Sequence, residues 1–258
     1  MSLAESMRRD WDERARRHAF YYIASWWDPT TFLASGEEDY QRLVAPSLSR
    51  ADFSPQGKTM LELGCGAGRM TSSFADCFGH VVAFDVSAEL LDRPRKLLGQ
   101  ATNITWVDGN GGDLSGTEDG SVDLVFSYLV SQYLPSEDLV CSYIRETFRV
   151  LRPGGLCLFQ WNGTERPTMN WRSQLALGAI DALWAIRLEN SGRSLACLIC
   201  FGPQMAGRSW HDIAMSAARV GDAARSSGGT VLEIRDERTS MASCCARKDS
   251  PASGARVS

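Results

Sequence analysis

Glycines and carboxylates at short spacing mark the part of the sequence best suited to bind a ligand. Gly64, Gly66 and Gly68 alternate with other residues, directly after an apolar run that contains Glu62. Glycine has no Cβ atom, so a backbone rich in it can turn tightly and approach a ligand closely. The next apolar run ends in Asp85, where a carboxylate can accept hydrogen bonds from both hydroxyls of a ribose. The pattern predicts a site for an adenosine-like ligand.

The elements that would position these residues alternate along the chain. Short apolar runs predict strands, and longer stretches with helical periodicity separate them, a rhythm typical of βαβ units and a parallel sheet. We expect strands over residues 59–63, 81–86, 104–107, 122–128 and 156–161, and helices over 67–78, 88–98 and 136–150. Arg152-Pro153-Gly154-Gly155 is expected to stop the last helix and turn the chain.

The end of the chain predicts one more helix and two strands. Residues 210–226 can form the helix, Gly228 and Gly229 break it, and residues 231–235 and 241–245 can form the strands. The fold class is therefore α/β, with a doubly wound, mainly parallel sheet of seven strands and helices on both faces.

Two regions lie outside this rhythm, and a chain of 258 residues favours one sizeable domain with additions. Residues 1–50 are expected to form an N-terminal helical cap, because Trp11, Ala15, His18, Tyr22 and Trp26 recur at near-helical spacing. Residues 51–248 would form the main domain, residues 162–209 an insertion that covers an acceptor, and residues 249–258 a flexible tail. Packing into the core would explain the apolar residues of 1–50 and of 162–209 about as well as covering a ligand would.

With these motifs the sequence resembles the class I S-adenosylmethionine-dependent methyltransferases, in particular the type 11 group. The Gly-x-Gly-x-Gly spacing suits that family, whereas nicotinamide-binding folds usually show Gly-x-Gly-x-x-Gly. The resemblance runs over roughly residues 58–161, through Trp106-Val-Asp-Gly109-Asn110, Asp123-Leu-Val-Phe-Ser127 and Leu151-Arg-Pro-Gly-Gly155. It implies a Rossmann-like sheet and S-adenosylmethionine as the cofactor.

The resemblance also implies roles for individual residues. The turn formed by Gly64, Cys65, Gly66 and Gly68 would approach the methionine part of the cofactor, and Glu62 would hold its amino group. Further contacts are implied for Asp85 with the ribose, Val86 with the adenine, Asn110 and Gly111 with the adenine edge, and Ser127 with the wall between cofactor and acceptor. Family members commonly have an acid where this chain has Asn110, and the amide oxygen of Asn110 can accept the same hydrogen bond.

Catalytic residues are harder to assign, because methyl transfer depends mainly on alignment and exclusion of water. A neutral oxygen acceptor would need a base, and the candidates are His18, Ser127 and Gln132. His18 lies in the expected cap, where a packed or surface histidine is the simpler interpretation. Gln132, with Tyr128 and Tyr133, could line the wall beside Ser127.

Net charge and composition limit the classes of substrate and partner that we expect for this protein. A net charge of −4 argues against nucleic acid as a substrate, and no apolar run is long enough to span a bilayer. A cytoplasmic enzyme acting on a small or medium organic acceptor is expected, with its oligomeric state undetermined. No metal is expected, because Cys197 with Cys200 and the adjacent Cys244 and Cys245 do not form two spaced ligand pairs.

Two alternatives stay open at this stage. A nicotinamide-dependent oxidoreductase on a related sheet would bind a different cofactor, and the glycine spacing argues against it. A non-catalytic scaffold or regulatory subunit could keep the cofactor fold without turnover, and no residue on the acceptor side excludes it.

Overall fold

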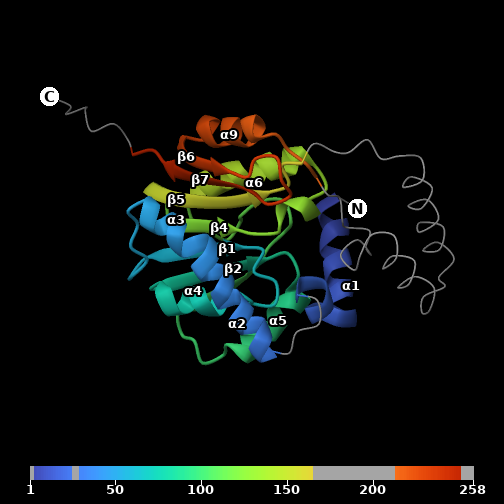
Figure 1. Cartoon of the computed structure of the whole chain (residues 1–258). Coiled ribbons are helices and arrows are strands. Elements are labelled where there is room, and N and C mark those ends of the chain that lie inside the picture. The colour runs from blue at the N-terminus through green and yellow to red at the C-terminus, as the bar shows by residue number, and fades with distance from the viewer. Residues whose placement is uncertain (1–2, 25–28, 165–212, 251–258) are drawn as a thin grey trace, which may run out of the picture.

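The computed structural model describes residues 3–24, 29–164 and 213–250, and its centre is one seven-stranded sheet (Figure 1). The strand order is β3-β2-β1-β4-β5-β7-β6. The first five strands pair in parallel, and β7 runs antiparallel to both β5 and β6. The predicted fold class is confirmed. The strands are β1 (Thr59–Leu63), β2 (His80–Asp85), β3 (Ile104–Asp108), β4 (Val122–Ser127), β5 (Leu151–Trp161), β6 (Gly229–Arg235) and β7 (Ala242–Lys248).

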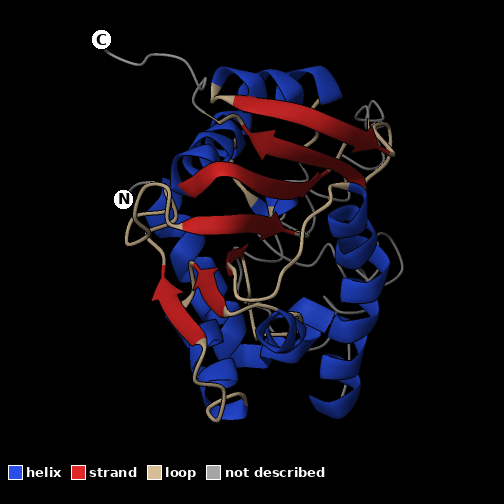
Figure 2. Cartoon of the chain, turned by 90° about the vertical axis from the view of Figure 1, so that its left-hand side faces the viewer, coloured by secondary structure: helices blue, strands red, loops and turns tan. Residues whose placement is uncertain are grey.

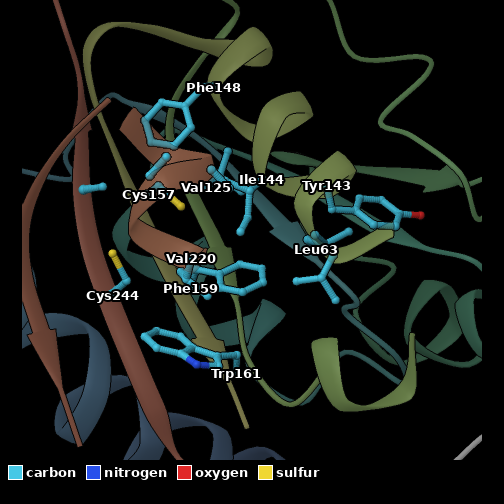
Figure 3. Close-up of a cluster of buried hydrophobic side chains, with 14 of the residues drawn as sticks. Leu63, Val125, Tyr143, Ile144, Phe148, Cys157, Phe159, Trp161, Val220 and Cys244 are labelled. Carbon is cyan, nitrogen blue, oxygen red and sulfur yellow. The ribbon is translucent and has the colours of Figure 1, made fainter. Parts of the chain in front are cut away.

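One face of the sheet packs against α6 (Glu137–Val150) and α9 (Ala217–Ser226). Figure 3 shows the side chains that fill this layer, among them Ile144 and Phe148 of α6 and Val220 of α9. Trp161, at the end of β5, is fully buried there and donates a hydrogen bond from its indole Nε1 to the carbonyl of Met215, at 3.0 Å.

The opposite face is covered by helices from the first hundred residues, so the sheet lies between two helical layers (Figure 2). The helices packed on this face are the π-helical η1 (Tyr40–Val44), α3 (Ala45–Arg50), α4 (Thr71–Cys77) and α5 (Ala88–Leu97). Helix α2 (Pro29–Asp39) lies against η1 and α4. Alternation along the strands divides the side chains between the layers. Cys244 therefore faces α6 and α9, whereas its neighbour Cys245 faces the other layer.

The strand order reverses at β1, which lies between β2 and β4. Ligands of open α/β sheets bind at such a point, outside the carboxyl ends of the strands. The carboxyl end of β1 leads straight into the glycine-rich turn of Gly64–Gly68. The topology therefore puts the motif that the sequence singled out at the expected crevice.

Several sequence predictions are wrong at element boundaries. The helix after the glycine turn begins at Thr71 rather than residue 67, because Gly68 has φ +82° and its amide donates to the carbonyl of Cys65 in a turn. β5 begins at Leu151 rather than residue 156. Val122 pairs with Leu151 and Leu124 with Leu156, so residues 152–155 bulge from the strand instead of preceding it.

The N-terminal region is helical, as predicted, and begins with α1 (Leu3–Ala24), followed by α2, η1 and α3. Most of the expected insertion at 162–209, including Cys197 and Cys200, lies outside the described residues, as do Trp26 and the tail beyond residue 250. The last predicted helix begins at Ala217 in the structure, where Ser216 caps it by accepting from the amide of Arg219. Among the described residues, no helix is long and apolar enough to cross a membrane.

Candidate functional site

A cavity opens at the glycine turn, and its empty space, with the open solvent at its mouth included, is about 1060 Å³. Ligands of open α/β sheets bind at this end of the strands. Six of the residues predicted to bind a cofactor line this cavity: Glu62, Gly64, Cys65, Gly66, Asp85 and Val86. They come from the ends of β1 and β2 and from the turn between β1 and α4.

Glu62 is a buried carboxyl group in this wall, with a relative exposure of 5%. The hydroxyl of Thr71 donates a hydrogen bond to its Oε2 at 2.6 Å. Burial raises the pKa of Glu62 to about 8, although the Thr71 hydrogen bond and the charge of Arg69 oppose that rise. A positive charge placed in the cavity would favour the ionised form of Glu62.

Asp85 is the second buried acid, with a relative exposure of 7%. Its Oδ2 accepts from the amide of Gly66 at 2.8 Å, and its Oδ1 accepts from the amide of Ser87 at 2.9 Å. Burial raises the pKa of Asp85 to about 6, opposed by these backbone hydrogen bonds. Asp85 therefore fixes the glycine turn, and each of its oxygens keeps acceptor capacity for a ligand hydroxyl.

Gly64 shows why the turn needs glycine. Its φ of +78° is unfavourable for other residues, and a Cβ atom there would lie 2.2 Å from Cγ2 of Val130. Its amide donates to the carbonyl of Phe84 at 2.7 Å, which links the turn to β2. The backbone at Gly64 thus packs directly against the opposite wall of the cavity.

Helix α1 contributes the outer wall through Met7 and Trp11. The Trp11 ring lies edge-on to Tyr133, with 5.0 Å between centroids. Arg8 pairs with Asp108 at 2.6 Å, and Arg16 pairs with Glu89 at 2.9 Å. These contacts attach the N-terminal helix across the carboxyl ends of the strands, so an aromatic side chain from the expected cap borders the cavity.

The loop after β4 supplies wall residues that the sequence analysis missed. Leu129 adopts φ +58°, a strained conformation for a leucine, and lines the cavity together with Val130. Strained residues are often held at functional sites by their surroundings. Here Gln160 of β5 accepts a hydrogen bond from the Leu129 amide at 2.8 Å and donates to the carbonyl of Ser240 at 2.8 Å.

Arg69 is another wall residue that was not predicted. Its side chain is only 12% exposed and pairs with Asp39 at 2.7 Å. It also donates to the carbonyl of Ser35 at 3.1 Å, and a Cβ atom at Gly36 would lie 1.8 Å from the Arg69 carbonyl oxygen. The backbone of helix α2 therefore packs directly against the backbone at Arg69, immediately after the glycine turn.

Other predicted residues lie outside the wall of this cavity. Gly68 packs against Pro94, where a Cβ atom would lie 2.5 Å away. Asn110 uses its amide within its own loop: its oxygen accepts from the amides of Gly112 and Asp113, and its nitrogen donates to Asp113 and Ser115. Neither Asn110 nor Gly111 is a wall residue, and their contacts with a ligand stay predictions.

Two of the three catalytic candidates, Ser127 and Gln132, do not line a common cavity among the described residues. Ser127 lines a second cavity, and its Oγ is buried with no hydrogen-bond partner among the described residues. Gln132 is 7% exposed in the short 3₁₀-helix η2 (Ser131–Tyr133) and lines neither cavity. His18 belongs to α1, and its side chain lies outside the described part of the chain. The described residues contain no group of three or more potential metal ligands.

Comparison with known proteins finds similarity to methyltransferases. Residues 61–159 match a family model described as a methyltransferase domain. Phosphoethanolamine N-methyltransferase 1 of Triticum aestivum is 36% identical over 126 residues, which cover 48% of this chain and 25% of that protein. Trans-aconitate 2-methyltransferase of Variovorax paradoxus is 29% identical over 203 residues, covering 75% of this chain and 70% of that protein. The chain spans between 25% and 29% of the length of the two wheat relatives that it matches.

Solved structures share the fold at low sequence identity. The Haemonchus contortus phosphoethanolamine N-methyltransferase 1, in complex with phosphoethanolamine and S-adenosylhomocysteine, superposes with a TM-score of 0.65 at 15% identity, covering 100% of this chain and 52% of that one. Magnesium protoporphyrin IX methyltransferase from Synechocystis, with bound S-adenosylhomocysteine, gives a TM-score of 0.58 at 13% identity, covering 95% and 99%.

Proposed function

We propose that the chain is a class I S-adenosylmethionine-dependent methyltransferase that transfers a methyl group to a small organic acceptor. One observation carries the proposal: two buried carboxyl groups, Glu62 and Asp85, face one cavity with the glycine turn between them. The family match favours this activity over the nicotinamide-dependent alternative.

The cavity suits the charge of the cofactor. Burying a carboxylate is costly unless a positive charge or hydrogen bonds compensate it. Thr71 gives Glu62 one hydrogen bond, and the cofactor's ammonium group would give it a charge-assisted one. A ligand with both an ammonium and a sulfonium group is therefore a better occupant than a neutral one.

We assign the remaining contacts by chemistry. Asp85 would accept from the ribose hydroxyls while it holds the amide of Gly66, and Val86 would pack against the adenine. Gly64 and Gly66 would let the backbone approach the methionine part. The roles predicted for Cys65, Gly68, Asn110, Gly111 and Ser127 are retained as part of this proposal.

S-adenosylmethionine, held by Glu62, Asp85 and the glycine turn, would supply a methyl group that its sulfonium activates for transfer to a lone pair of the acceptor. The chain's own residues align the two reactants and exclude water. Met7 and Trp11 close the outer side of the cavity, and Leu129 and Val130 close the inner side. Burial raises the pKa of Tyr128 above its ordinary value.

A small acceptor is favoured by the walls and by the relatives. Phosphoethanolamine and trans-aconitate, named in two of the related enzymes, are both small. A macromolecular acceptor would need an accessible surface at the methyl donor, whereas α1 covers this side of the cavity. The net charge of −4 also disfavours nucleic acid.

Calorimetry and turnover test the proposal together. We expect the purified chain to bind S-adenosylmethionine and S-adenosylhomocysteine, and to transfer labelled methyl from the former to a member of a small-molecule acceptor panel. Binding of a nicotinamide dinucleotide with no heat from either methyl-donor compound would overturn the assignment. Cofactor binding without turnover, in a stable complex with another protein, would support the scaffold alternative instead.

A further inference from the structure

A second cavity adjoins the first, and the two share Phe126 and Tyr128 as wall residues. It lies beside the carboxyl ends of β4 and β5, under η1 and the turn between β6 and β7. The shared wall is formed by the end of β4 and the residue after it, so a molecule bound in the second cavity would lie next to a molecule bound in the first cavity. This placement suits the reactant that receives the methyl group.

The walls combine apolar surface with guanidinium groups. Leu43, Leu158 and Met241 line the cavity, together with the side chains of Arg42 and Arg235. The two arginines come from η1 and the end of β6, far apart in the sequence. Their side chains are 61% and 39% exposed, so a ligand from solvent can reach them.

Positive charge exceeds negative charge around this cavity. Asp39 is shared by Arg42 at 2.5 Å and Arg69 at 2.7 Å. Glu233 is likewise shared by Arg50 at 3.2 Å and Arg235 at 3.5 Å. Asp236 adds one carboxylate, so two guanidiniums, those of Arg42 and Arg235, and one carboxylate line the cavity.

Both wall arginines keep donors for a ligand. A guanidinium has five N–H groups, and Arg42 uses some of them on Asp39 and on the Tyr128 phenol. Arg235 donates to the Ser47 hydroxyl at 3.1 Å and pairs with Glu233. The planar fork that remains matches a carboxylate or phosphate group.

We propose that this second cavity binds the acceptor and that Arg42 and Arg235 select an acceptor with an anionic oxyacid group, a carboxylate or a phosphate. The inference rests on the proposed methyltransferase function. The guanidiniums hold the anionic end, the apolar residues contact the carbon skeleton, and the Tyr128 phenol lies at the boundary with the cofactor cavity.

The test measures anion binding to the full chain saturated with S-adenosylhomocysteine, by calorimetry at constant ionic strength. The probes are inorganic phosphate and succinate, with glycerol as a neutral reference. We expect phosphate or succinate to bind and glycerol not to bind. Tighter binding of phosphate would point to a phosphomonoester acceptor, and tighter binding of succinate to a carboxylic acid.

Substitution of the charged wall residues should change the affinity for the anion in predictable directions. Arg42→Gln and Arg235→Gln should each weaken binding of the preferred anion about tenfold, because each removes charge-assisted hydrogen bonds. Arg225→Gln is the matched control, since it removes an exposed, ion-paired arginine of α9, and it should leave anion binding within about twofold. Asp236→Asn should strengthen binding roughly threefold by removing the carboxylate of the wall, and asparagine tolerates the φ of +52° at this position.

The outcomes separate the two proposals. Normal binding of S-adenosylhomocysteine with no anion binding, or with anion binding indifferent to Arg42, Arg235 and Asp236, would overturn the acceptor site alone. Absence of S-adenosylhomocysteine binding in folded protein would overturn both. If the arginine variants do not fold, the sign of the Asp236→Asn effect still decides, and unchanged or weaker anion binding in that variant refutes the inference.

Discussion

Replacing Glu62 by glutamine should stabilise the unliganded protein at high pH while weakening its hold on the cofactor. Burial raises the pKa of Glu62 from 4.5 to about 8 in the folded state. Between these values the folded protein holds a proton that the unfolded chain has lost, so the unfolding free energy falls as pH rises. Glutamine has nearly the same shape and stays neutral at every pH, so the variant avoids this loss.

The size of the effect follows from the same values. The gap between 4.5 and about 8 corresponds to about 5 kcal/mol once Glu62 is fully ionised. Because the cavity is open to water at its mouth, ionisation is partly solvated, and we expect about 1 to 3 kcal/mol in practice. The variant should match the wild type near pH 5 and exceed its unfolding free energy by that amount at pH 9.

Urea unfolding at pH 5, 6, 7, 8 and 9, without cofactor and at fixed ionic strength, measures the difference. Glu146→Gln is the matched control, because Arg149 lowers the pKa of Glu146. Its ionised form contributes stability that is present above the unfolded pKa and lost as pH falls. The control should therefore lower the unfolding free energy at pH 7. A difference between Glu62→Gln and wild type that does not change with pH would refute the reasoning.

The Glu62→Gln variant should bind S-adenosylhomocysteine about tenfold or more weakly than the wild type, because an amide cannot compensate the ligand's ammonium group. In the wild type the ammonium selects the ionised form of Glu62, so affinity should rise between pH 6 and pH 8, with proton release. The variant should lack that rise. Calorimetry in buffers of different ionisation heat measures both quantities, and equal affinities for the two proteins at pH 8 would remove Glu62 from the cofactor site.

Three further substitutions test the site and its support. Asp85→Asn should weaken S-adenosylhomocysteine binding by about 1 to 3 kcal/mol, and unchanged calorimetric affinity in a folded variant would exclude the assigned contact. Gly64→Ala should cost about 1 to 3 kcal/mol in urea unfolding, since its Cβ would meet Val130 at 2.2 Å, and adding Val130→Ala should recover part of that loss. Gly36→Ala should lower the melting temperature, because the new Cβ would lie 1.8 Å from the backbone oxygen of Arg69; an unchanged melting temperature would contradict the close packing of α2.

Local patterns in the sequence were enough to predict the sheet and the part of the cavity wall that contains Glu62, the glycine turn and Asp85. β1 spans Thr59–Leu63 as expected, because an apolar run ends at a glycine turn. The alternation of strands and helices also gave the fold class. Helix starts were harder: residues 67–70 have no residue that forbids a helix except Gly68, whose φ of +82° keeps them in a turn.

The opposite wall depends on contacts between distant residues, which no local pattern reveals. Leu129 has an ordinary sequence neighbourhood, yet at φ +58° its amide donates to the side chain of Gln160, 31 residues later in β5. The second cavity likewise joins η1, two central strands and the turn after β6. Arginines scattered along the sequence gave no sign that Arg42 and Arg235 would share a wall.

The titratable side chains of the two cavities favour ligands of opposite charge. Buried Glu62 and Asp85 make the first cavity a place where positive charge is stabilised, at a cost to the stability of the empty protein. Arg42 and Arg235 make the second favourable for negative charge. A cationic methyl donor and an anionic acceptor would therefore each be disfavoured in the other's cavity, and the shared wall at Phe126 and Tyr128 would keep them in contact. Such an arrangement would separate the reactants by electrostatics before any catalytic group is required, which would suit a reaction that depends mainly on alignment.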